Sequence, residues 1–160
     1  MDKQSLIDVI IEKLEDIHQV AISATQSAIE AATNEETVPE NKYDTLALEA
    51  AYLAHGQARR VQECEADIQR FKALPTVSFD PMSAVGLTAI IQLIDENDQA
   101  SLFFMGPCSG GVKVIYLNQQ VTIITPEAPL GKAMLGQRVG DEIVLEIAGK
   151  QVGYEITSII

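Results

Sequence analysis

The sequence predicts an α+β protein: an N-terminal antiparallel helical hairpin, built as a coiled coil, followed by a small antiparallel β domain with one short helix. Apolar residues recur at alternating steps of three and four along residues 10–31 and again along residues 43–71. After Pro75 the chain becomes rich in Val, Ile, Leu and Gly, with turn residues at short intervals. We therefore expect a hairpin domain over residues 1–75 and a β domain over residues 76–160.

Each predicted helix carries a heptad seam, the pattern of a coiled coil. The first seam consists of Ile10, Leu14, Ile17, Ala21, Ala24, Ala28 and Ala31. The second consists of Tyr43, Ala47, Ala50, Ala54, Gln57, Val61, Cys64, Ile68 and Phe71. Only a short polar segment, Thr33 to Glu40, separates them, so the two helices should fold back on each other. Pro75 ends the second helix because proline cannot continue it.

The β domain is predicted from short apolar runs bounded by turn residues. The expected strands are residues 88–94, 100–105, 112–116, 121–124, 142–147 and 152–159. The third is expected to pair with the fourth, and a hairpin turn at Gly149-Lys150 joins the last two. A short helix over residues 130–135 closes at Gly136.

The formal net charge of −12 argues against nucleic-acid binding, which needs a surplus of Lys and Arg. A protein partner with a basic groove fits this charge better. Cys64 and Cys108 are expected to be free thiols, as is usual in the cytoplasm. The sequence shows no secretory signal and no apolar run long enough for a membrane span, which predicts a cytoplasmic protein with no membrane partner.

The turn of the predicted hairpin is acidic, with Glu35, Glu36, Glu40 and Asp44 close together. One interpretation is an ordinary solvated tip. Another is that two tip carboxylates complete the coordination of a Mg²⁺ ion held by a partner, because Mg²⁺ takes oxygen ligands. Such an ion can activate water for phosphodiester hydrolysis. The tip offers too few ligands for a complete site within this chain.

Three other groups of residues favour ordinary structural roles. Pairing four residues apart on one helix, as in Arg59 with Glu63, explains the basic residues of the second helix better than a docking surface does. His18 and His55 could face each other across the hairpin, but they lack further zinc ligands at suitable spacing. Cys108 has no histidine in the β domain that could activate it as a nucleophile.

Two segments resemble the bacterial Gre family of transcript-cleavage factors, which bind RNA polymerase. Residues 128–141, Ala-Pro-Leu-Gly-Lys-Ala-Met-Leu-Gly-Gln-Arg-Val-Gly-Asp, are similar to the family's C-terminal signature, except that Ala128 stands where Ser is usual. Residues 40–44, Glu-Asn-Lys-Tyr-Asp, are similar to its Glu-Asn-x-x-Tyr tip element, with Tyr43 one place early. The order of hairpin, Pro break and β domain matches the family over the whole chain.

The resemblance implies an FKBP-like β domain that docks at the rim of the polymerase secondary channel, while the hairpin tip enters the channel. It implies that the partner is contacted by Asn41, Tyr43, Asp44, Pro129, Leu130, Gly131, Lys132, Gly136, Gly140 and Asp141. It further implies that Glu40 assists cleavage of backtracked RNA by helping to hold a polymerase-bound Mg²⁺. Thr37 stands where cleaving members have a second acidic residue, and Glu36 is the candidate substitute.

On this interpretation the chain is an accessory factor rather than an enzyme, with no cofactor of its own. It would meet nascent RNA only through the polymerase and would not bind DNA directly. One alternative is a channel-binding regulator that does not stimulate cleavage. Another is a hairpin that binds an unrelated protein or a second copy of itself. Prolyl isomerisation, the activity associated with an FKBP-like fold, is not expected because the chain has no Trp to line a pocket.

Overall fold

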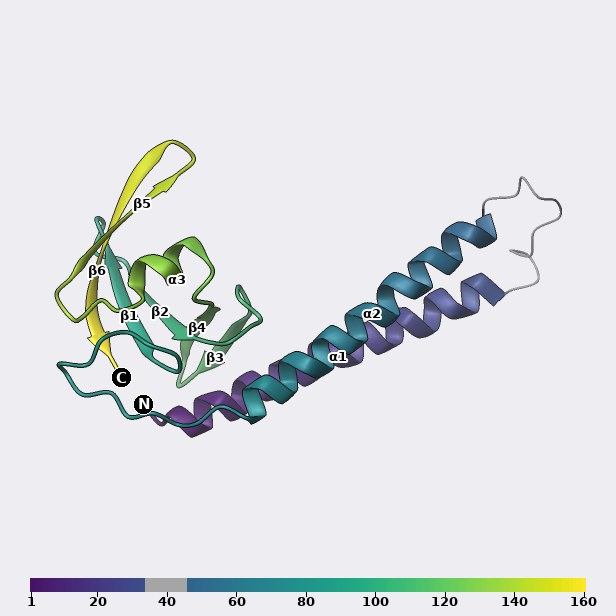
Figure 1. The fold of residues 1–160 in the computed structure, drawn as a ribbon, viewed down its shortest axis with the longest axis horizontal. Coiled ribbons are helices and arrows are strands. Elements are labelled where there is room, and N and C mark those ends of the chain that lie inside the picture. The colour runs from purple at the N-terminus through teal and green to yellow at the C-terminus, as the bar shows by residue number, and fades with distance from the viewer. Residues whose placement is uncertain (34–45) are drawn as a thin grey trace. The chain divides into compact units, whose positions relative to one another are not determined.

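The computed structural model describes residues 1–33 and 46–160. Two long helices, six strands and one short helix follow one another in it (Figure 1). In chain order these are α1 (Lys3–Thr33), α2 (Leu46–Lys72), β1 (Ile90–Asp95), β2 (Ala100–Met105), β3 (Lys113–Tyr116), β4 (Gln119–Ile124), α3 (Pro129–Met134), β5 (Glu142–Ile147) and β6 (Lys150–Ile159). The predicted fold class, a helical hairpin followed by a small sheet with one short helix, is confirmed.

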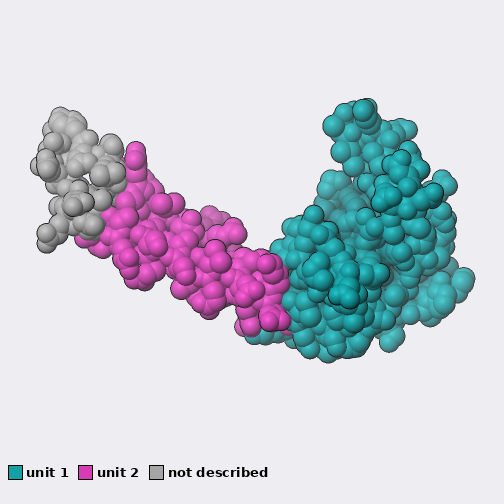
Figure 2. Space-filling model, turned by 180° about the vertical axis from the view of Figure 1, so that it is seen from behind, with its two compact units in different colours: residues 1–10, 70–160 teal, residues 11–69 magenta. Residues whose placement is uncertain are grey.

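The described chain forms two compact units, which Figure 2 colours separately. One contains Met1–Ile10 together with Arg70–Ile160, and the other contains Ile11–Gln69. The first turns of α1 and the last residues of α2 therefore group with the sheet, whereas the sequence places the domain boundary at residue 75.

The heptad seam of α1 is largely confirmed. Within the unit of residues 11–69, α1 and α2 lie side by side (Figure 1). Leu14, Ala21 and Ala28 are buried, as the seam requires. Ala31 was expected to continue the seam and is instead exposed, so the buried stripe stops about one turn before the helix ends. In α2, Ile68 is buried.

The sheet has the strand order β3-β4-β2-β1-β6-β5. Four of its pairings are antiparallel, and β2 pairs with β4 in parallel. The prediction of a wholly antiparallel sheet was therefore wrong at this pairing. The loop after β2 is too long for a tight hairpin, so the chain crosses to the edge strand β3 and returns as β4 beside β2. The predicted pairing of β3 with β4 is confirmed.

Two-residue turns set the register of the β3–β4 and β5–β6 hairpins. Only two residues, Leu117 and Asn118, connect β3 to β4, and their φ values are 49° and 61°. Ala148 and Gly149, with φ values of 51° and 77°, connect β5 to β6 in the same way. Positive φ at both central positions is the turn geometry that matches the twist of paired strands. The second turn therefore lies one residue earlier than the predicted Gly149-Lys150.

One face of the sheet packs against α3. The residues at the centre of this core are buried aliphatic and methionine side chains from strands, loops and the helix. They are Val85, Ala89, Ile91, Leu93, Met105, Ile124, Met134, Ile143, Ile156 and Ile159. Met134 brings α3 into the cluster, and Phe103, Leu130 and Tyr154 pack around it. The rings of Phe103 and Tyr154 therefore lie at the periphery of the core.

The opposite face of β2 receives Phe71 from the end of α2. Phe104 follows Phe103 along β2 and therefore points away from that residue's face. The rings of Phe71 and Phe104 lie 6.3 Å apart, and both side chains are buried. A Cβ atom at Gly106 would come within 3.0 Å of the Phe71 ring and 2.9 Å of Ile123. The absent side chain at Gly106 therefore makes room for Phe71.

The start of α1 is tied to the same unit by polar contacts. Asp2 caps the helix, because its carboxylate accepts the Ser5 backbone N–H at 3.0 Å. The Tyr116 hydroxyl donates to the Asp2 carbonyl at 3.1 Å. Lys3 donates to the Val77 carbonyl, and its Nζ lies 4.3 Å from the centre of the Phe79 ring. Burial lowers the pKa of Lys3 from its ordinary value.

We predict that Phe71→Ala lowers the free energy of unfolding by about 3 to 5 kcal/mol, because it empties a buried ring site and removes an aromatic pair. Chemical denaturation followed by circular dichroism measures the loss. Tyr52→Ala is the matched control, since Tyr52 is 70% exposed on the same helix and its truncation should change stability by less than about 0.5 kcal/mol. Equal effects of the two substitutions would contradict the assignment of Phe71 as an anchor.

Candidate functional site

The predicted tip residues lie outside the described part of the chain, which ends at Thr33 and resumes at Leu46. This applies to both candidate carboxylates and to the three tip residues expected to contact a partner. They are Glu36, Glu40, Asn41, Tyr43 and Asp44. Their roles stay predictions. Among the described residues, no group of three or more His, Cys, Asp or Glu side chains is arranged to hold a metal ion.

The other predicted site residues, from Pro129 to Asp141, are placed by the structure on and after α3. Pro129 occupies the first turn of the helix, where its missing N–H costs nothing. Gly131 is buried against the preceding strand end, and a Cβ atom there would lie 1.9 Å from the Thr125 carbonyl oxygen. Only glycine fits this close approach between helix and backbone.

Gly136 ends the helix and binds a neighbouring loop. Its φ of +81° is the left-handed conformation that glycine adopts without strain. Its N–H donates to the Val85 carbonyl at 2.9 Å, and the Val85 N–H donates to the Gln137 carbonyl at 2.7 Å. The end of the predicted helix is therefore also hydrogen-bonded to the loop that precedes β1.

Gly140 and Asp141 form the turn into β5. Gly140 has a φ of +90°, and its N–H donates to the Ile156 carbonyl at 2.8 Å. The Asp141 carboxylate accepts the Arg138 backbone N–H at 2.8 Å, and its carbonyl accepts the Ile156 N–H at 3.0 Å. These contacts give the Gly-Asp pair a structural task. Contact of these residues with a partner stays a prediction.

Sequence reasoning missed three exposed apolar residues next to this motif. Leu135 and Val139 lie within the signature segment, and Leu87 lies two residues after Val85 in the loop fastened to it. Pro129, Lys132 and Arg138 are also exposed in this region, so a partner can reach all of these side chains. The signal was present in the sequence, since residues 135 and 139 are spaced by four and flank the glycine that ends the helix.

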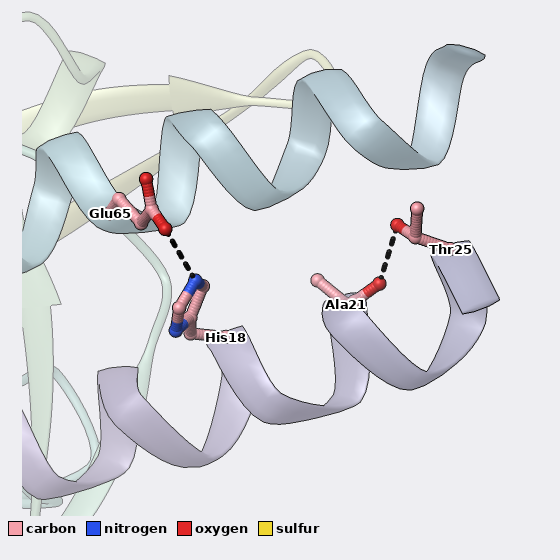
Figure 3. A network of polar contacts seen from close by, with 4 residues as sticks. All are labelled: His18, Ala21, Thr25 and Glu65. Atoms are coloured by element: carbon pink, nitrogen blue, oxygen red, sulfur yellow. Dashed lines mark hydrogen bonds and ion pairs between the residues drawn. The ribbon is translucent and has the colours of Figure 1, made fainter. Parts of the chain in front are cut away.

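In the hairpin unit, His18 faces Glu65 and not His55, which is exposed (Figure 3). His18 Nε2 lies 3.3 Å from a Glu65 carboxylate oxygen, close enough for an ion pair, although the angle is unsuitable for a hydrogen bond. Both residues flank their seams at equivalent heptad positions, which meet in an antiparallel pair. Thr25 on α1 donates its hydroxyl to the Ala21 carbonyl at 2.9 Å (Figure 3).

The remaining candidates have ordinary partners or surroundings. Arg59 Nε donates to Glu63 at 3.1 Å, an exposed pair four residues apart, as predicted. Cys64 and Cys108 are free thiols, also as predicted, and Cys108 is buried. No helix within residues 1–33 and 46–160 combines the length and apolar character needed to cross a bilayer.

Two of the hollows on the β domain differ in charge. The larger, of about 530 Å³, lies where β2 and β4 begin, and Lys113 is the one charged residue that lines it. The smaller, of about 360 Å³, lies between the β1–β2 turn and the β5–β6 pair. Five carboxylate residues line it, and no Lys or Arg does: Asp95, Glu96, Asp98, Glu142 and Glu155.

Asp95 holds the β1–β2 turn beside this smaller hollow. Its carboxylate accepts the backbone N–H groups of Gln99 at 2.9 Å and Asn97 at 2.8 Å. These hydrogen bonds, that from Gln99 above all, lower the pKa of Asp95 from its ordinary value. The carboxylate of Glu96 reaches across and accepts the Gly153 N–H at 3.1 Å, which fixes β6 to the turn.

The structure is a helical hairpin followed by a small β domain, in which glycine-dependent contacts hold α3 and the segment after it. Residues 84–160 match the family model described as transcription elongation factor GreA/GreB, C-terminal. The predicted resemblance of the chain to the Gre family is therefore confirmed.

Relatives match over most of the chain. It is 27% identical over 149 residues to transcription elongation factor GreA of Thermodesulfovibrio yellowstonii, covering 92% of this chain and 88% of that one. It is 26% identical over 149 residues to GreA of Syntrophus aciditrophicus, covering 92% and 86%. Among solved structures, the GreA factor homolog Gfh1 of Thermus thermophilus aligns with a TM-score of 0.39 at 18% identity, covering 94% of each chain.

We predict that Gly131→Ala lowers the free energy of unfolding by roughly 2 to 3 kcal/mol, because the new methyl group collides with the Thr125 carbonyl. Denaturant unfolding monitored by strand circular dichroism measures it. The control is Gly56→Ala in α2, where the new Cβ meets open space and should raise helix stability by about 0.5 to 1 kcal/mol. A stable Gly131→Ala protein would show that the α3 contact is looser than described.

We predict that Asp95→Ala destabilises the domain at neutral pH and that this loss shrinks on acidification. The pKa of Asp95 is lowered on folding, so its contribution is present above the unfolded value of about 3.9 and disappears as pH falls through the folded value. Thermal unfolding between neutral pH and pH of about 2.5 tests the trend. Asp95→Asn, which keeps an acceptor but cannot titrate, separates the turn from the charge. A pH-independent Asp95→Ala deficit would contradict this account.

Proposed function

We propose that this chain is a cytoplasmic transcription elongation factor that binds RNA polymerase through its β domain and inserts its hairpin tip into the secondary channel. The observation that carries the proposal is the GreA/GreB C-terminal domain over residues 84–160, following a hairpin with heptad seams. Relatives that cover most of the chain are named transcription elongation factor GreA.

The chemistry belongs to the polymerase, and the chain contributes tip carboxylates. Glu40 matches the family's tip carboxylate, and Glu36 is the candidate for the second one. Glu40 and Glu36 would complete the coordination of a Mg²⁺ ion held by the polymerase, and the ion supplies activation of the attacking water. The nascent RNA is met only inside the polymerase.

The exposed side chains after α3 are the candidates for the polymerase contact. Lys132, Leu135 and Val139 lie on the surface, whereas Gly131 is held inside by its backbone contact. Pro129, Leu130, Gly136, Gly140 and Asp141 would then act mainly by presenting those side chains.

The alternative is a secondary-channel regulator that binds polymerase without stimulating cleavage. The departure that favours it is Thr37 at the position where cleaving members carry an acidic residue. Both forms require polymerase binding, and they differ only in the RNA product. A hairpin for an unrelated protein partner is the third candidate, and it requires no polymerase binding.

We predict that the chain shortens RNA from its 3′ end when added with Mg²⁺ to a stalled, backtracked polymerase complex, and that Glu40→Ala lowers the rate about tenfold or more, because a transition-state charge contact is lost. Gel analysis of labelled RNA measures the fragments. Glu12→Ala, exposed on α1 away from the tip, is the control. Glu65→Ala serves less well, since Glu65 lies against His18.

Three outcomes distinguish the candidates. Fragments that depend on Glu40 support the cleavage proposal. Co-purification with polymerase but no fragments above polymerase alone leaves the regulator as the function. Failure to co-purify at low salt, where charge attraction is strongest, removes both polymerase functions.

A further inference from the structure

The far end of the β5–β6 hairpin has no third strand beside it. β6 pairs with β1 only from Tyr154 to Ile159, whereas it pairs with β5 from Lys150 to Glu155. Within the described chain, residues 144–153 therefore form a two-stranded ribbon, which extends beyond the other strands in Figure 1. A two-stranded ribbon alone is marginally stable in water, so this end of the sheet gains from a further strand.

The outer edge of this ribbon is β5, the last strand of the sheet. Edge strands are commonly protected by charged side chains, above all lysine, by proline or by a bulge, because their unpaired backbone groups accept other strands. The charges on β5 are the acidic Glu142 and Glu146, which repel an acidic strand but attract a basic one. β5 contains no lysine and no proline, and its pairing with β6 runs without a register shift. Val144 is 60% exposed at its centre, and Ile147 is exposed at its end.

One face of β5 alternates acidic and apolar side chains. Glu142, Val144 and Glu146 are exposed and share a face, because side chains two residues apart point the same way. Glu142 also lies directly opposite Glu155 of β6, a like-charge pair that opposes folding. This pair belongs to the acidic hollow that Asp95, Glu96 and Asp98 also line. A strand that carried basic side chains at this edge would relieve the repulsion.

We propose that β5 is a docking edge that adds an extended, basic segment of a partner protein as a seventh strand. The matching segment reads basic, apolar, basic at alternate positions, so that its cations meet Glu142 and Glu146 while its apolar side chain covers Val144. The nearby carboxylates around Glu155 add attraction. A second copy of the chain fits poorly, because antiparallel pairing of two β5 strands about Val144 sets Glu142 against Glu146.

The test uses the full chain and a short fluorescent peptide in which lysine and valine alternate with threonine. Fluorescence anisotropy is expected to show saturable binding, and hydrogen exchange of the β5 amides should slow on addition of peptide. A peptide of the same sequence with alternate backbone amides methylated keeps its charge but cannot pair as a strand. It is expected to bind about tenfold or more weakly, because an added strand is held by its backbone hydrogen bonds.

Variants locate the edge. Val144→Lys places a positive charge, of the same sign as the peptide's, at the centre of β5 and should weaken peptide binding about tenfold. Ile115→Lys is the matched control, since Ile115 is 64% exposed on β3, the edge strand at the other side of the sheet. It should leave the affinity within about twofold. Circular dichroism of both variants verifies that the sheet is intact.

Four results would overturn the proposal. The methylated peptide could bind as tightly as the parent, which means general charge attraction, or neither peptide could bind. Ile115→Lys could weaken binding as much as Val144→Lys. Light scattering could reveal a dimer that Val144→Lys abolishes, in which case the occupant of the edge is a second copy of the chain.

Discussion

The packing of Phe71 beside Gly106 is the interaction on which the junction of helix and sheet depends. The Phe71 ring lies against Phe104 and close to Ile123, in space that any other residue at position 106 would fill. Burying such a ring stabilises the folded state by a few kcal/mol, which is a large part of the net stability of a small domain. The end of α2, from Arg70 onward, therefore belongs to the compact unit that contains the sheet.

Much of the fold was predictable because its signals are local. Heptad spacing marked the helices, and β2 and β5 were predicted with the bounds that the structure has. The parallel pairing of β2 with β4 was not predictable, because strand direction depends on where a loop crosses and not on side-chain period. The exposure of Ala31 was missed for a related reason. A seam pattern states which residues can be buried, and packing decides how far the partner helix accompanies them.

The signature after Pro129 illustrates how a motif divides between architecture and recognition. The backbone requires glycine at three positions of this segment. Gly131 lies too close to a carbonyl oxygen for a side chain, and Gly136 and Gly140 have positive φ. The sequence shows that glycine stands at these positions, but the contacts and turns that require glycine appear only in three dimensions. The exposed Leu135 and Val139 answer no internal demand. Under the proposed function, these exposed side chains are available for the partner contact, and sequence reasoning overlooked them.

Charge connects the two proposed partner surfaces. With a net charge of −12, the chain approaches any basic surface faster than a neutral protein would, and salt weakens that attraction. A general field does not choose an orientation, so the choice must come from local arrangement. Along one edge of β5, acidic and apolar side chains alternate. This pattern specifies both the register and the charge of a partner strand. Beside α3, the local arrangement consists of exposed apolar side chains near Lys132. This arrangement selects a partner surface by its shape more than by its charge. Two surfaces with such different chemistry therefore favour different partner segments.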